Sequence, residues 1–127
     1  MSGLLAALVL AAGCSDDDDP EPRAERPVRP KPTPQARCPP DLSGCRIATG
    51  RIVYVEGVDP DGDGDAHFVL ASREGITAPG ISVIDVRKGL RPKPLPRPGD
   101  TLSAAGRVQT GSYGQRQIEA VAVRTAR

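Results

Sequence analysis

The sequence predicts an all-β fold of five short strands, and three observations carry this prediction. From residue 46 onward, apolar and β-branched residues fall in short runs that are bounded by Gly, Pro and Asp. No run in this region has the 3.6-residue spacing of an amphipathic helix. The region is long enough for a single domain, whose core would be marginal without a further constraint such as a disulfide.

The expected strands follow one another along the chain. The first is centred on residues 52–55 (IVYV), and the fourth alternates so that Leu102, Ala104 and Val108 share one face. Residues 110–114 contain two glycines and are expected to form a hairpin turn between the fourth and fifth strands. The five expected strands are residues 47–58, 66–71, 81–86, 101–109 and 117–123.

The number and spacing of these strands point to a particular barrel. Five strands in about eighty residues, with Pro98-Gly99-Asp100 leading into the fourth, resemble an OB-type Greek-key barrel. The family usually places a helix between its third and fourth strands. Here that interval reads KGLRPKPLPRPGD, so we expect an extended loop in place of the helix. An SH3-like barrel or a small open sheet are the structural alternatives.

The chain begins with a short apolar leader. Residues 4–12 are apolar or small and too few to cross a hydrocarbon core, which needs roughly 20 residues. The leader ends in Ala11-Ala12-Gly13-Cys14, and it resembles a bacterial lipoprotein signal peptide, although leucine is more usual where Ala11 stands. The resemblance implies that residues 1–13 are removed and that Cys14 carries a lipid on the outer side of the membrane. Ordinary cleavage or an unprocessed tail are the alternatives.

Residues 14–37 have the composition of a disordered linker. The segment holds six prolines and no apolar residue larger than Val28, so it cannot bury enough surface to fold. The run of four aspartates at 16–19 is interpreted as a solvated charge cluster rather than a metal site. We therefore expect a semi-rigid tether that joins the lipid to a folded domain at residues 38–127.

Cys38 and Cys45 are the two cysteines left after Cys14. In an oxidising compartment, an even pair at short range most simply forms a disulfide that closes a small loop. Zinc would require more ligands, and a redox pair would require closer spacing. We expect a structural disulfide at the start of the domain.

An acidic loop between the first two expected strands is the densest group of metal-type ligands. Its aspartates resemble the opening of an EF-hand calcium loop, with Gly64 at the sixth position. Leu70 stands at the twelfth position, where that loop has a glutamate, so any calcium site would be weak. An acidic turn without metal is the alternative. The candidate ligands are Asp59, Asp61, Asp63 and Asp65.

His67 is the only histidine, and it follows the acidic loop directly. It could act as a ligand, as a base, or as a hydrogen-bonding partner of the loop. No motif places a Ser or Cys nucleophile beside it, so a catalytic dyad is unsupported. A calcium-dependent hydrolase would need arginines such as Arg73 and Arg87 around a bound phosphate. The sequence therefore predicts a protein that is not an enzyme.

The loop between the third and fourth expected strands is strongly basic. An anionic envelope polymer or a lipid headgroup would suit such a cluster. Single-stranded nucleic acid is disfavoured, because base stacking needs aromatic residues and this region has three, Tyr54, Phe68 and Tyr113. The candidate anion-binding residues are Arg87, Lys88, Arg91, Lys93 and Arg97.

Together, the leader, the Pro-rich tether and the small barrel resemble uncharacterised bacterial lipoproteins, a likeness that implies no activity. We expect a lipid-anchored extracytoplasmic binding or structural module that requires no cofactor, with calcium as an optional ligand. Its expected partners are the membrane, through the lipid, and an envelope protein or anionic polymer. An OB-type binder of single-stranded nucleic acid or anionic polymer is the first alternative, and a calcium-dependent hydrolase is the second.

Overall fold

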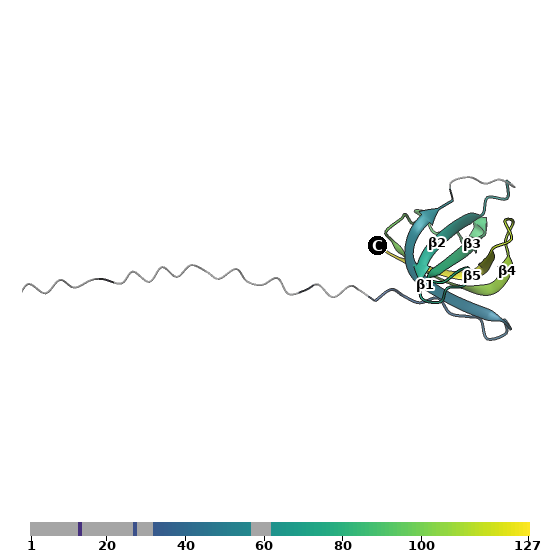
Figure 1. The fold of residues 1–127 in the computed structure, drawn as a ribbon, viewed down its shortest axis with the longest axis horizontal. Helices are drawn as coiled ribbons and strands as arrows, with labels where there is room; N and C mark the ends of the chain where they lie inside the picture. Colours follow the sequence, from purple (N-terminus) through teal and green to yellow (C-terminus); the bar gives the residue numbers. More distant parts are fainter. Residues whose placement is uncertain (1–12, 14–26, 28–31, 57–61) are drawn as a thin grey trace, which may run out of the picture. The chain divides into compact units, whose positions relative to one another are not determined.

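The computed structural model of the 127-residue chain describes residues 13, 27, 32–56 and 62–127. Five β-strands form the described domain, and the predicted all-β class is confirmed (Figure 1). No helix in this part of the chain is long and apolar enough to traverse a bilayer. The strands are β1 (Cys45–Val55), β2 (Ala66–Ser72), β3 (Ile81–Val86), β4 (Thr101–Thr110) and β5 (Arg116–Ala126).

The strands close into a barrel in the order β1-β2-β3-β5-β4. The pairing of β3 with β5 is parallel, and the other strand pairs are antiparallel. The long strand β1 closes the barrel by pairing with two strands. Its residues 45–51 pair with β4, and its residues 50–55 pair with β2. This arrangement is consistent with a small OB-like barrel.

Two glycines allow the strands to approach closely where the barrel bends. A Cβ atom at Gly50 would collide with the carbonyl group of Ala71, and one at Gly106 would collide with the carbonyl group of Glu119. Gly106 lies beside the irregularity in the β4–β5 register. The close backbone contact explains why β1 and β4 each contain a glycine in the strand interior.

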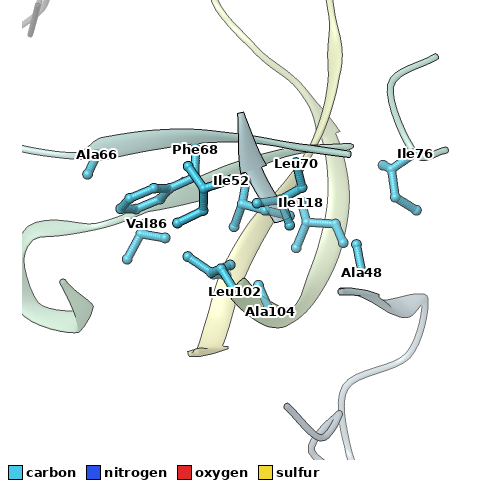
Figure 2. Close-up of a cluster of buried hydrophobic side chains, with 12 residues drawn as sticks. Ala48, Ile52, Ala66, Phe68, Leu70, Ile76, Val86, Leu102, Ala104 and Ile118 are labelled. Atoms are coloured by element: carbon cyan, nitrogen blue, oxygen red, sulfur yellow. The ribbon is translucent and has the colours of Figure 1, made fainter. Parts of the chain in front are cut away.

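The core lies inside the barrel and is built mainly from aliphatic side chains (Figure 2). Phe68 and Leu70 of β2 point inward and are fully buried, and His67 and Val69, which alternate with them, are only partly buried. His67 and Phe68 therefore point to opposite faces of the barrel wall. The other large, fully buried apolar side chains are Ile52, Ile84, Val86, Leu102 and Ile118.

The predicted disulfide is confirmed, since Cys38 and Cys45 are joined at the start of β1. The segment before it covers the outer face of β4. The backbone N–H of Ala36 donates to Ser103 Oγ over 2.9 Å, and Ala36 is 3% exposed. Thr49 Oγ1 lies 2.7 Å from the same Ser103 oxygen. Both faces of β4 are consequently buried near Ser103, where the sequence alternation indicated one buried face.

Between β3 and β4 the chain forms one 3-10 turn, η1 (Lys88–Leu90), followed by an extended Pro-rich loop. The prediction that a loop replaces the family's usual helix is confirmed. Leu90 and Leu95 of this region pack against the core, which anchors the loop to the barrel. The predicted end of the first strand, at residue 58, lies outside the described residues.

Candidate functional site

A shallow hollow of about 280 Å³ lies on the outer face of the barrel. Strands β1, β2 and β3 supply its floor, and the hairpin between β4 and β5 supplies one wall. We call it the tyrosine depression. Its lining residues are Tyr54, Glu56, His67, Val69, Val83, Tyr113 and Gln115.

Both tyrosines of the chain line this depression and are well exposed. Tyr54 is 57% exposed and Tyr113 is 75% exposed, whereas Phe68, the third aromatic residue, is buried in the core. Val69 and Val83 are direct partners across β2 and β3 and form an apolar floor between them. Exposed aromatic rings beside an apolar floor are typical of ligand-binding surfaces.

His67 lies between two carboxylates at the edge of the depression. Its Nδ1 atom is 2.7 Å from Glu56 Oε2, at the point where β1 ends. Its Nε2 atom is 3.6 Å from Oδ1 of Asp85, its cross-strand partner on β3. The first contact has hydrogen-bond length, and the second is a longer electrostatic contact. The titratable side chains of His67 on β2 and Asp85 on β3 are thus brought together with that of Glu56, which directly follows β1.

A row of hydrogen bonds continues from Asp85 to the β4–β5 hairpin. Gln117 Nε2 donates to Asp85 Oδ2 over 3.3 Å, and Gln115 Nε2 donates to Gln117 Oε1 over 2.9 Å. Gln115 Oε1 in turn accepts the backbone N–H of Tyr113 over 3.0 Å. These hydrogen bonds therefore link the β4–β5 turn, which contains Tyr113, to Asp85 on β3.

Burial raises the pKa of Asp85 above its ordinary value. The charge of His67 opposes this shift, and the carboxylates of Asp65, Asp63 and Glu119 add to it. Among the described residues, no donor lies within hydrogen-bond distance of the buried Asp85 Oδ1 atom. The edge of the depression thus contains two carboxylate side chains, Glu56 and Asp85, with the imidazole of His67 between them.

The described end of the acidic loop lies against the basic loop. The backbone N–H of Asp65 donates to Asp63 Oδ1 over 2.8 Å, and that of Lys88 donates to Asp65 Oδ1 over 3.2 Å. Arg91 Nη1 donates to the carbonyl oxygen of Gly64 over 3.0 Å. The loop end is therefore held by local and cationic contacts.

The predicted calcium ligands are only partly covered by the structure. Asp59 and Asp61 lie outside the described residues, as does the predicted lipidation site Cys14. Within the described ranges, no three His, Cys, Asp or Glu side chains form a group that could hold a metal ion. Weak calcium binding stays a prediction, which thermal melts with and without calcium would test.

Three of the five predicted anion-binding residues share a second hollow, of about 310 Å³. Lys88, Arg91 and Lys93 line it together with Pro92 and Leu95, and we call it the cationic hollow. Arg87 and Arg97 are exposed and do not line it.

Arg73, named for the hydrolase alternative, follows the far end of β2 from His67. At about 3.3 Å per strand residue, the two residues are roughly 20 Å apart along the strand. The structure therefore does not bring Arg73 to His67.

The tyrosine depression was not predicted as a site. The alternation of β2 and β3 does indicate that His67, Val69, Val83 and Asp85 point outward, but it does not say which hairpin lies over them. Tyr113 reaches the depression only because β5 pairs in parallel with β3. That pairing is a property of the closed barrel, which no local pattern specifies.

A scan against protein-family models finds no matching family, and a search of curated proteins finds no significant match.

Proposed function

We propose that this protein is a non-enzymatic, lipid-anchored binding module of the cell envelope and that the tyrosine depression is its ligand-binding surface. One observation carries the binding surface: both tyrosines of the chain are exposed and line the same apolar hollow. The signal-peptide resemblance, the Pro-rich tether and the disulfide support an extracytoplasmic location.

The chemistry of the lining favours binding over catalysis. Among the residues that the structure describes, those that line the depression include no Ser, Thr or Cys that could act as a nucleophile. His67 Nδ1 is already paired with Glu56, and its Nε2 faces Asp85. The depression offers aromatic and apolar area with a charged edge, which is the composition of a recognition surface.

The position on the barrel also supports this proposal. OB-type barrels bind oligonucleotides and oligosaccharides on the face of strands 2 and 3, between the loops that follow strands 1 and 4. The tyrosine depression occupies the corresponding face and reaches the β4–β5 loop. Carboxylates at its edge disfavour a polyanion such as nucleic acid there.

The proposal is tested by capturing partners from intact cells with the tethered full chain as bait. Tyr54→Ala and Tyr113→Ala should each reduce recovery of the bound component, whereas Val53→Ala should not. Val53 is the matched control, because it is 48% exposed but does not line the depression. Equal recovery with all three variants would exclude the depression as the ligand surface.

The lipid anchor is tested separately. Mass spectrometry of the mature protein should find a fatty-acid modification on Cys14, and Cys14→Ser should release the chain from the membrane fraction. Recovery of an unmodified product with its leader intact would contradict the proposed location.

A second function is favoured by the cationic hollow. Lys88, Arg91 and Lys93 surround an apolar base of Pro92 and Leu95, and this suits an anionic envelope polymer. Retention on an anionic polysaccharide resin should fall when Lys88 and Lys93 are both changed to Gln, and it should weaken as salt rises. Arg116→Gln, an exposed cation outside the hollow, is the matched control.

A further inference from the structure

We infer that the tyrosine depression recognises a basic, proline-rich segment of a partner polypeptide. This inference rests on the proposed function, in which the depression is the ligand surface, and it assigns the chemical class of that ligand. Three features of the depression lead to it: the tyrosine rings, the acidic edge and the absence of a free strand edge at its floor.

The rings and the floor suit proline. Tyr54 and Tyr113 present exposed rings on either side of the Val69–Val83 pair. Aromatic-lined grooves bind proline-rich segments because the polyproline II conformation is already formed and little entropy is lost on docking. An apolar ring of the ligand can therefore lie against each tyrosine without ordering a flexible chain.

The edge of the depression suits a cation. Glu56 lies on the lining, and Asp85 lies just behind His67 with one carboxylate oxygen that accepts no hydrogen bond from the described residues. Asp63, Asp65 and Glu119 are close enough to act electrostatically on Asp85. A lysine or arginine of the ligand would gain from these carboxylates and from the faces of the tyrosine rings. A neutral sugar would use the rings but not the carboxylates, and a polyanion would be repelled.

The closed barrel sets the conformation of the ligand. At the floor of the depression, Val69 pairs with Tyr54 on one side and Val83 on the other, and Val83 also pairs with Gln117, so a partner segment cannot join the sheet there as an additional strand. Recognition must then come from side chains of the barrel face, which is the mode used for polyproline II segments rather than for β-strands.

Hydrogen bonds within the chain fix the β4–β5 hairpin beside the depression in the absence of a ligand. Gln115 accepts the Tyr113 N–H and donates to Gln117, which itself donates to Asp85. A surface whose aromatic wall is already fixed loses less freedom on binding. Tyr113 therefore acts as a fixed wall rather than as part of a loose loop.

The inference is tested by titrating the full chain, held in a neutral detergent, with three probes. They are a capped peptide of repeating Arg-Pro-Pro, the same peptide with Glu in place of Arg, and a chitin oligosaccharide. The Arg-Pro-Pro peptide should bind and weaken as salt rises, and the Glu-Pro-Pro peptide should bind at least about tenfold more weakly.

The variants locate the contact. Tyr54→Ala and Tyr113→Ala should each weaken binding of the Arg-Pro-Pro peptide by about tenfold. Glu56→Gln keeps an acceptor for His67 but removes the charge, so it should weaken binding severalfold and reduce the salt dependence. Glu74→Gln, an exposed carboxylate in the β2–β3 loop, and Val53→Ala should leave binding unchanged.

Three outcomes would overturn the inference: no binding of the Arg-Pro-Pro peptide, equal binding of both peptides, or binding that survives both tyrosine substitutions. Binding of the sugar alone, lost in Tyr54→Ala, would replace the assigned ligand class and leave the depression as the ligand surface. The proposed function itself fails only if partner capture from cells is indifferent to both tyrosines. The two failures are thus distinguishable.

Discussion

The outer surface of this barrel has two contrasting faces. On β4, small side chains such as Ser103 and Ala105 are fully buried, and the chain's own segment at Ala36 lies over Ser103. On β1–β3, the larger side chains Tyr54 and Val69 remain accessible in the tyrosine depression. The first face is covered by other residues of the chain, whereas the described residues leave apolar area exposed on the second.

Under the proposed function, this contrast divides the surface of a small domain between stability and recognition. The covered face is closed by specific hydrogen bonds and a disulfide, so changes there should lower the free energy of unfolding. The open face contributes little to the fold, so changes there should alter binding and leave stability nearly intact. Four predictions test this division, in order of decreasing effect.

Gly106→Ala should be the most damaging single change. The added Cβ would meet the backbone of Glu119, which cannot move without disturbing the β4–β5 pairing. Overpacking against fixed backbone should lower the free energy of unfolding by about 3 kcal/mol. Denaturant unfolding measures this. Gly89→Ala is the matched control, because a Cβ there meets no atom within 4 Å. Equal midpoints for the two variants would contradict the close backbone contact.

Removing the disulfide should have the next largest effect. Cys38 and Cys45 close a short loop at the start of the covered face, and the double change to Ser frees that loop in the unfolded chain. In the chain-entropy account, the loss is about 2–3 kcal/mol. Thermal melts of oxidised protein and the double variant measure it. Binding at the tyrosine depression should survive in the double variant below its melting temperature, and loss of binding there would show that the two faces are coupled.

Ser103→Ala and Tyr54→Ala compare the two faces directly. Ser103→Ala leaves the buried Ala36 N–H without its acceptor and also removes the contact with Thr49. An orphaned buried donor should cost about 1–2 kcal/mol. Tyr54→Ala removes a side chain that is 57% exposed and should change stability by only about 0.5 kcal/mol. Chemical unfolding of both variants checks the order, and a larger loss in Tyr54→Ala would reverse the assignment of the two faces.

The sequence predicted the covered parts of the fold better than the open face. Alternation placed Leu102 and Ala104 on one face of the fourth strand, and the cysteine spacing predicted the disulfide, because both depend on residues close together in the chain. The tyrosine depression depends on the parallel β3–β5 pairing, which brings Tyr113 to a face built by earlier strands. The contact between Asp65 and Lys88 was also missed, since it joins two loops that were interpreted separately.

Asp85 gives the smallest predicted effect on stability, and its sign can be worked out. Burial raises its pKa above the ordinary value of 3.8, so the folded protein binds this proton more tightly than the unfolded chain. Its contribution therefore favours folding below 3.8 and is lost as pH rises through the folded-state pKa. Asp85→Asn keeps an acceptor for Gln117 but cannot ionise, so the variant should gain stability relative to the native protein as pH rises from acid to neutral. Thermal melts across that range measure the difference, with Glu74→Gln as the exposed control. The opposite result would be a native protein whose stability rises relative to that of Asp85→Asn as pH approaches neutral. It would mean that the charge of His67 outweighs the effect of burial, so that the ionised carboxylate stabilises the fold.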